Sequence, residues 1–439
     1  MRNHVDFSSH ASFVLQNAPD VALKTVSNDS LNLPSRDDLV LRVAGGSPVE
    51  RVYGKRNIRR AHVLALLRSG GALSRTEIAR RLGYNAATVT VIVDELVASG
   101  LVLEDFERRP GMGRPPTLVS LDGTAASVIG LDLGRTSVSA MLMDLNGNIL
   151  GAASSEAGLP EEPEACGLVA RKLVAEAVAV APVPIPPIAG VAAVFPGIFW
   201  AEENGVRKLV PRAAAVELAL QQAIGIPPVI DGDSLAVSFA ELWFGGRPNL
   251  NSFVSINVSE GLGSVLFTHG QYLAGAHGCA GDLGHVQLGD ADVACFCGAS
   301  ACLENVASGS GMRRLAKMAG LIGPGSHADA DVIAGLARQG NSDAKAIFGR
   351  FAQALGRGIA SVVQYTDPGV VVIGGSLSRH ADLYLSEVGE EARRNLPRHQ
   401  RDFELIVSTL NEDAVCRGAC AVLLNRIFGA SHLSVETIV

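Results

Sequence analysis

The sequence predicts an α/β protein of two or three domains, in which an N-terminal winged helix-turn-helix precedes a body of two lobes. The first observation is the composition, which is 48% hydrophobic, 18% charged and 5% aromatic. Such a balance is typical of large buried sheets with helices between them. The second observation is a cluster of helical patterns before residue 122, and the third is the mixture of strand and helix patterns after it.

Changes of pattern divide the chain into three parts. Residues 1–50 are polar and weakly periodic, which predicts a flexible tail. Residues 51–122 form the predicted winged helix-turn-helix, and residues 123–439 form the body. Within the body we assign about residues 123–235 and the C-terminal helix to lobe one, and about residues 236–414 to lobe two.

Membrane insertion and export are not expected. The chain has no run of eighteen apolar residues, and its N-terminus lacks a basic start followed by an apolar core. Seven cysteines, an odd number, in a long chain without an export signal favour a reducing compartment. We therefore expect a cytoplasmic protein.

Three helices are predicted after the tail. The stretch that starts at Asn57 has helical spacing of apolar residues and ends at a Gly-Gly pair. Ser74 with Glu77 predicts a capping box on a short helix that ends at Gly83. Asn85 then caps a longer helix, which can lie in a DNA major groove. Its buried side is expected to hold Val89, Ile92, Val93, Leu96 and Val97.

The distribution of charge supports DNA binding at this end of the chain. The net charge of −7 argues against general affinity for nucleic acid. Between Arg51 and Arg81, however, nine Lys or Arg residues accompany a single acid, Glu77. Residues 101–122 then predict two strands around a loop of Gly, Pro and Arg, which would form a basic wing. The alternatives are a solvated helix face or a small helical oligomerisation module.

The body opens with a strand, a Gly turn, a second strand and an Asn-Gly-Asn hairpin turn in "SVIGLDLGRTSVSAMLMDLNGNIL". Helical stretches separate the strands that follow. These further strands are predicted near residues 189–195, 228–230, 253–258, 264–268 and 370–373. The alternation predicts a two-lobed α/β arrangement.

Three of the seven cysteines fall within the stretch "ACFCGASACLEN". Cys295 and Cys297 are too close in sequence for an easy disulfide, and their spacing is not that of a C-x-x-C redox pair. With Cys302 they supply three thiolates, and His285 lies ten residues before Cys295. Tetrahedral zinc needs four such donors, so we predict a structural Zn²⁺ site. Structural thiols without a metal are the alternative.

The stretches "GDLGHVQL" and "CFCGASACLEN" resemble the signature of the ROK family (repressors, open reading frames and sugar kinases), G-E-x-G-H followed by C-x-C-G-x-x-G-C-x-E. The resemblance runs from about Arg56 onward. The N-terminal module resembles that of ROK repressors of the N-acetylglucosamine and xylose type, and ROK kinases lack it. The resemblance implies an actin/hexokinase-like body with a structural zinc. Ala301 stands where the family usually has Gly, a small change that we expect the metal site to tolerate.

The same resemblance implies a sugar site. ROK kinases use an Asn-Asp pair, in which Asn binds sugar hydroxyls and Asp is the general base. Asp233 takes the position of the base, but Gly232 replaces Asn. Asp233 as the N-cap of a helix starting near Ser234 is the alternative. The other implied sugar contacts are Asp282, shorter than the usual Glu, His285 and Glu304. We expect a sugar pocket of altered selectivity, with a decayed pocket as the alternative.

Both phosphate loops of the ROK kinases are altered. The usual D-x-G-G-T here keeps Asp132, Gly134 and Thr136, but Arg135 replaces the second Gly. The usual G-T-G-x-G is "SEGLG", residues 259–263, which keeps Gly261 and Gly263. Glu260 brings a negative charge toward a polyphosphate, which disfavours ATP. We therefore expect vestigial phosphate loops and no kinase activity.

These observations predict a regulator, most simply a repressor, of carbohydrate metabolism genes. A homo-oligomer, dimer or tetramer, would bind double-stranded operator DNA and respond to a sugar effector. Arg75, Arg80 and Arg81 are expected to contact phosphates, Arg114 of the wing a minor groove, and four residues to face bases, namely Ala86, Ala87, Thr88 and Thr90. One alternative is an ATP-dependent sugar kinase, hexokinase- or glucokinase-like, that also binds DNA. Another is a DNA-binding protein whose body only dimerises.

Overall fold

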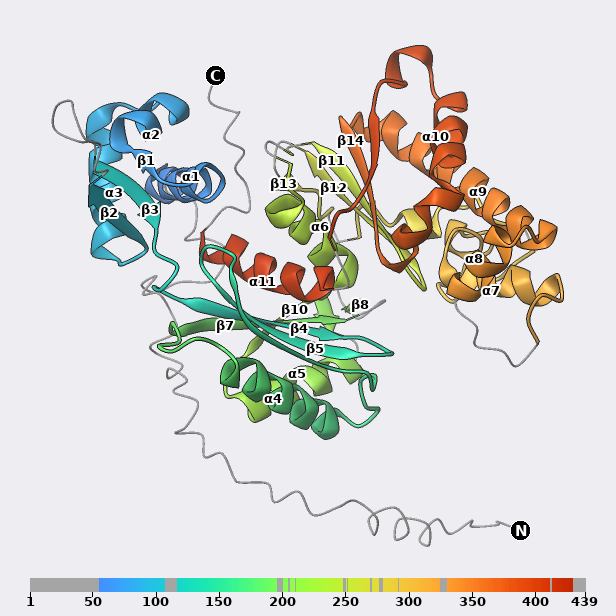
Figure 1. Ribbon diagram of the computed structural model, residues 1–439, viewed down its shortest axis with the longest axis horizontal. Coiled ribbons are helices and arrows are strands. Elements are labelled where there is room, and N and C mark those ends of the chain that lie inside the picture. Colours follow the sequence, from blue (N-terminus) through green and yellow to red (C-terminus); the bar gives the residue numbers. More distant parts are fainter. Residues whose placement is uncertain are drawn as a thin grey trace, which may run out of the picture. The chain divides into compact units, whose positions relative to one another are not determined.

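The computed structural model (Figure 1) describes residues 55–428, apart from residues 107–116, 196–199, 204–205, 210, 248–249, 251, 269–270, 276–278, 291, 324–329 and 411–412. The predicted tail lies outside the described residues. Within the described part, no helix is both long and apolar enough to cross a membrane.

The N-terminal domain is a winged helix-turn-helix, as predicted. Its core is formed by side chains that helical spacing turns inward, and Ile78, Val89 and Leu96 are fully buried. Val97, which we predicted on this side, is instead 38% exposed near the end of its helix. The strands form a sheet of order β1-β3-β2. The elements are α1 (Lys55–Gly70), β1 (Leu73–Ser74), α2 (Arg75–Leu82), α3 (Ala86–Ala98), β2 (Val102–Phe106) and β3 (Thr117–Leu121).

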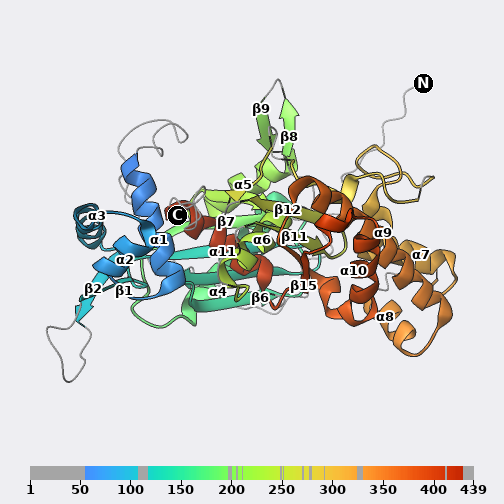
Figure 2. The same cartoon turned by 90° about the horizontal axis from the view of Figure 1, so that it is seen from above.

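The first sheet of the body has the strand order β10-β7-β4-β5-β6. β4 pairs antiparallel with β5 and parallel with β7, so the sheet is mixed. Helices α4 and α5 cover one face and α11 the other (Figure 1). The elements are β4 (Ser127–Leu133), β5 (Val138–Asp144), β6 (Ile149–Ser155), α4 (Pro163–Ala179), β7 (Ile188–Phe195), α5 (Pro211–Ile224), β10 (Pro228–Gly232) and α11 (Ala414–Ile427). A hairpin of β8 (Trp200–Glu203) and β9 (Val206–Leu209) projects beside α5 (Figure 2).

The second sheet has the order β13-β12-β11-β14-β15. Alternation along β11 places Val254 and Ile256 in a core with α7, α8 and α9, and places Phe253 in another core with Phe239 of α6. Its elements and their helices are α6 (Asp233–Phe244), β11 (Phe253–Val258), β12 (Leu262–Thr268), β13 (Gln271–Tyr272), α7 (Gly309–Met318), α8 (Ala330–Arg338), α9 (Ser342–Thr366), β14 (Val370–Gly374), α10 (Leu385–Arg394) and β15 (Glu404–Val407).

Short 3₁₀ turns complete the second half of the body: η2 (Leu283–His285), η3 (Leu303–Asn305), η4 (Ser376–Leu383) and η5 (Arg398–Gln400). All the body strands that the sequence predicted are present. The two-sheet α/β body therefore confirms the predicted fold class.

Candidate functional sites

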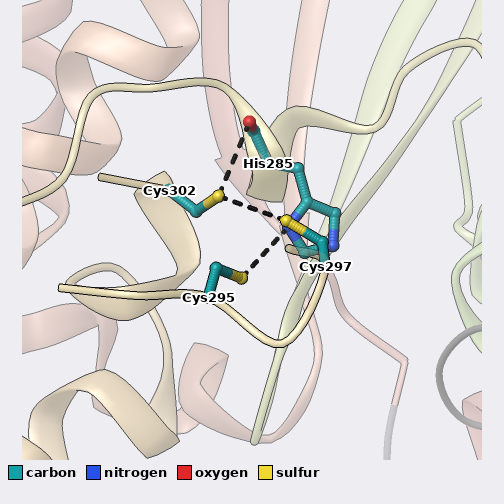
Figure 3. A group of neighbouring side chains, drawn as sticks. All are labelled: His285, Cys295, Cys297 and Cys302. Atoms are coloured by element: carbon teal, nitrogen blue, oxygen red, sulfur yellow. Dashed lines mark hydrogen bonds between the residues drawn. The ribbon is translucent and has the colours of Figure 1, made fainter. Parts of the chain in front are cut away.

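The four predicted zinc ligands lie together (Figure 3). His285 ends η2, Cys302 precedes η3, and Cys295 and Cys297 lie on the loop between them. The donor atoms of the four residues all lie within 4.8 Å of one another. Cys295 Sγ is 3.6 Å from His285 Nδ1, and Cys297 Sγ is 3.6 Å from Cys302 Sγ. The group can therefore surround a single ion with tetrahedral preference.

Backbone hydrogen bonds shape the loop that carries the cysteines. Gln287 and Cys302 form an antiparallel bridge, and the Cys295 amide donates to the Ala299 carbonyl at 2.8 Å. Ala301 has a φ of 59°, in the left-handed region. The prediction that the metal site tolerates Ala301 rests only on the size of the residue. This backbone conformation explains why the ROK signature has Gly at this position, because a side chain with a Cβ costs on the order of 1 kcal/mol in the left-handed region.

The chemistry of the donors also fits zinc. Burial and hydrogen bonds with the neighbouring thiols raise the pKa of Cys302 to about 12. Hydrogen bonding, first to the backbone at Ala299, lowers the pKa of the exposed Cys297. Three thiols this close keep a proton between them unless a cation compensates for their charges, and Zn²⁺ prefers sulfur and imidazole donors.

Two half-buried aspartates lie at the predicted sugar and phosphate positions. Asp233 is the first residue of α6, and the N-cap is Gly232, so the alternative in which Asp233 caps the helix is wrong. Its Oδ1 accepts a hydrogen bond from the Ser234 amide at 2.7 Å. Burial raises the pKa of Asp233, and the charge of Arg135 partly opposes this. Burial and the charge of Asp233 raise the pKa of Asp132, near the end of β4, to about 7.

The other predicted sugar contacts belong to segments that meet the start of β12. The Leu262 amide donates to Glu304 Oε2 at 2.9 Å. A Cβ on Gly284, beside His285, would lie 2.2 Å from the Leu262 carbonyl oxygen, which measures how closely η2 approaches this strand. Asp282 is the N-cap of η2. The segments that carry Asp282, His285 and Glu304 therefore meet at one strand end.

The neighbouring residue of β12 connects this strand end to Asp233. A Cβ on Gly263 would lie 2.1 Å from Ser234 Oγ, and Ser234 directly follows Asp233. The first turn of α6 is thus packed against the same strand end as η2 and η3.

The first phosphate loop, residues 132–136, joins β4 to β5. Arg135 and Thr136 are exposed, and the Gly134 carbonyl accepts a hydrogen bond from the Leu159 amide at 2.9 Å. The charge of Arg135 acts on Asp233. This loop therefore presents an exposed cation near one of the two half-buried aspartates.

The second phosphate loop, residues 259–263, is tied to α7. Arg313 donates to both oxygens of Glu260, at 2.6 and 2.5 Å. The first amides of α7 donate to the loop, from Gly309 to Ser259 O at 2.8 Å and from Ser310 to Glu260 O at 3.0 Å. The sequence alone predicts that Glu260 brings a negative charge toward a polyphosphate, whereas in the structure Arg313 pairs with that charge. Sequence reasoning missed Arg313 because nothing in the local pattern pairs residues 53 positions apart.

The predicted base-facing residues lie at the start of α3. Asn85 Oδ1 accepts a hydrogen bond from the Thr88 amide at 2.7 Å, which confirms the predicted cap. Ala86, Ala87 and Thr90 are exposed, and Thr88 is half-buried.

The predicted phosphate contacts differ in their surroundings. Arg80 and Arg81 are 71% and 40% exposed, and both pair with Glu77. The Glu77 amide donates to Ser74 Oγ, so that half of the predicted capping box is formed, while the Glu77 carboxylate holds the two arginines. Arg114 lies outside the described residues.

Arg75 is engaged within the domain. Its Nε donates to Glu104 at 2.7 Å, one terminal nitrogen donates to Asp94 at 2.6 Å, and the other donates to the Thr90 carbonyl at 3.2 Å. These bonds connect the start of α2 to α3 and β2. Contact with a DNA phosphate would require Arg75 to share or break them.

Models of two known protein families match the body and the N-terminal domain of this chain. The ROK family model matches residues 128–426, and a MarR family model matches residues 57–114. A xylose repressor from Caldicellulosiruptor bescii is 27% identical over 84% of this chain and 96% of its own length. A glucokinase from Thermotoga maritima is 29% identical over 69% of this chain and 98% of its own length.

A solved structure of a ROK family transcriptional regulator, a homologue of the Escherichia coli Mlc protein, superposes with a TM-score of 0.70. It is 22% identical and covers 86% of this chain and 97% of its own. At this identity the similarity supports the fold alone.

Proposed function

This chain belongs to the ROK family, and from that membership we propose that it is a cytoplasmic DNA-binding transcriptional regulator, most simply a repressor, of carbohydrate metabolism genes. The observation that carries the proposal is the presence, in one chain, of a winged helix-turn-helix matched by the MarR model and a ROK body. The similarity to a xylose repressor along nearly all of that protein agrees with it. A structural Zn²⁺ at the four-residue cluster completes the proposed body.

For the DNA complex we propose a homo-oligomer, dimer or tetramer, on an inverted-repeat operator. Arg80 and Arg81 would contact phosphates, and Arg114 would enter a minor groove. Arg75 would position α3 through its bonds to Asp94 and Glu104, instead of binding phosphate itself. The bases would face Ala86, Ala87, Thr88 and Thr90.

For the effector we propose a sugar or sugar derivative. Its hydroxyls would be held by Asp233, Asp282, His285 and Glu304. His285 can give one ring nitrogen to zinc and the other to a hydroxyl, which would couple the metal to the site. The names of the relatives, a xylose repressor and a glucokinase, make xylose and glucose the first compounds to test.

The proposed regulator has no kinase activity. Gly232 takes the place of the sugar-binding Asn of ROK kinases, and Arg135 takes the place of a phosphate-loop Gly. The ion pair of Glu260 with Arg313 and the hydrogen bonds from the first amides of α7 tie the second loop to that helix. These features oppose ATP binding, and the body would serve to sense the effector.

Replacement of Asp233 by Asn tests the effector site. We expect Asp233→Asn to bind operator DNA as tightly as the wild type but to need at least tenfold more sugar for release, because a charged acceptor of sugar hydroxyl protons is lost. The measurement is fluorescence anisotropy of an operator duplex, titrated with xylose, glucose and related sugars. Asp231→Asn, a matched change two residues earlier in β10, should respond like the wild type. An unchanged sugar response in Asp233→Asn would contradict the assignment.

A sugar kinase that also binds DNA is the second candidate. It is favoured by the half-buried pair of Asp132 and Asp233, since a carboxylate of raised pKa suits a general base. The similarity to the whole of a glucokinase points the same way.

Titration calorimetry with Mg–ATP separates the two candidates without knowledge of the sugar. We expect no binding heat from zinc-loaded protein that still binds DNA, because Arg135 replaces a phosphate-loop Gly and the second loop is tied to α7. Micromolar binding of Mg–ATP would support the kinase instead, and phosphorylation assays on a panel of sugars would follow.

A further inference from the structure

The outward face of α3 is small and apolar. Val89, Ile92, Val93 and Leu96 fix its buried side. At 3.6 residues per turn, Ala87, Val91 and Asp94 lie along the opposite side, with Thr90 next to them. Val91 is 54% exposed, which is unusual for valine, a residue that is most often buried. A branched apolar side chain therefore stands in the middle of the surface proposed to face the bases.

Three polar side chains on or beside this face, those of Thr90, Asn85 and Asp94, are engaged within the domain. Thr90 Oγ1 donates to the Ala86 carbonyl at 2.9 Å, so its hydroxyl is directed at the helix backbone. Asn85 Oδ1 is used by the cap, and Asp94 Oδ1 accepts from Arg75 at 2.6 Å. Apart from the hydroxyl of the half-buried Thr88, the groups left to meet a base edge are chiefly methyl groups.

The residue types of α3 narrow the bases that it can read. Its sequence, AATVTVIVDELVA, has no Arg or Lys, which pair with guanine, and no Asn or Gln, which pair with adenine. Alanine, threonine and valine can instead contact the C5-methyl group of thymine, which is the apolar group that an A·T pair presents in the major groove. Asp94 and Glu95 could accept from cytosine, but Asp94 is already paired with Arg75 and Glu95 is half-buried.

We infer that α3 reads thymine methyl groups and that Val91 is a specificity-determining residue, so that each operator half-site carries A·T pairs opposite Ala87, Thr90 and Val91. This inference rests on the proposed function, because it assumes that α3 enters a major groove. It adds the class of base that the helix recognises and a residue, Val91, that the sequence did not mark.

The test begins with the full-length, zinc-loaded protein and a pool of random duplexes, from which bound sequences are selected and read. Each thymine of the enriched half-site is then replaced by deoxyuridine, which pairs in the same way but lacks the methyl group. Dissociation constants are measured by fluorescence anisotropy at fixed salt. We expect at least one deoxyuridine position per half-site to weaken binding about fourfold, the effect of one buried methyl group.

Val91→Ala assigns the contact to a residue. Val91 is exposed, so the change should leave folding intact, and the deoxyuridine effect at one position per half-site should disappear in this variant. Val97→Ala is the matched control, the same change at an exposed valine near the end of the same helix, and it should keep every deoxyuridine effect. Loss of the effect in Val91→Ala but not in Val97→Ala would support the inference.

Two other outcomes would overturn it and are distinguishable. An enriched sequence whose deoxyuridine variants all bind like the parent, or whose deoxyuridine effects persist in Val91→Ala, would overturn this inference and leave the regulator proposal standing. A pool that yields no enriched sequence would overturn the proposed function, and the inference with it.

Discussion

Replacement of Cys302 by alanine is expected to release zinc and to lower the midpoint of thermal unfolding by on the order of 10 °C. Cys302 is fully buried between η2 and η3, and its loss leaves three donors where tetrahedral zinc needs four. Structural zinc contributes directly to folding, so we expect the free energy of unfolding to fall by roughly 4 kcal/mol. Zinc content by mass spectrometry and thermal unfolding by circular dichroism are the measurements.

Cys279→Ala is the matched control, because Cys279 is an exposed cysteine outside the four-residue cluster. It should keep one zinc per chain and the wild-type unfolding midpoint. A Cys302→Ala variant that also keeps both would show that the cluster does not hold a structural metal.

Local patterns account for what could be predicted. Helical and strand periods depend on near neighbours in sequence, so α2, α3 and most body strands followed from the order of apolar residues. The caps at Ser74 and Asn85 are equally local, since each side chain accepts from an amide three residues on. The cluster of His285 with three cysteines could be predicted because thiols are rare in this chain and three of them lie close together.

Contacts between distant segments account for most of what was missed. Two ion pairs join residues that are far apart in sequence: Arg313 with Glu260, 53 positions apart, and Arg75 with Glu104, 29 positions apart. The periodicity of a sequence does not predict such pairs. Charge counting over a segment treats each arginine as available, whereas Arg75 has three partners inside its own domain. Ala301 was missed for another reason, because residue size does not reveal a left-handed backbone.

The first turn of α6 shows how a shift of one residue changes an interpretation. The sequence offered Asp233 either as a cap or as a functional acid. With Gly232 as the N-cap, Asp233 is inside the helix, and capping no longer accounts for the residue. Two half-buried carboxylates this close repel each other, and the charge of Arg135 offsets only part of the cost at Asp233, an arrangement that is typical of ligand sites.

This cost leads to the second large expected effect: replacement of Asp132 by Asn should stabilise the protein at pH 8 and do so less at pH 5. Burial and the charge of Asp233 raise the pKa of Asp132 from 3.8 to about 7 in the folded state. The folded state therefore binds a proton that the unfolded state has lost, and stability falls as pH rises from the unfolded pKa through the folded one. That difference in pKa corresponds to at most roughly 4 kcal/mol of lost stability above pH 7.

Asparagine cannot ionise, so Asp132→Asn removes this loss. The free energy of unfolding of the variant should exceed that of the wild type by roughly 2 kcal/mol more at pH 8 than at pH 5, as measured by urea unfolding at both pH values. Asp402→Asn, at an exposed aspartate, is the control and should show no such dependence. Equal differences at the two pH values would mean that the folded protein already compensates Asp132. Such a result would contradict the interpretation of Asp132 and Asp233 as a destabilising pair that is retained to bind a ligand.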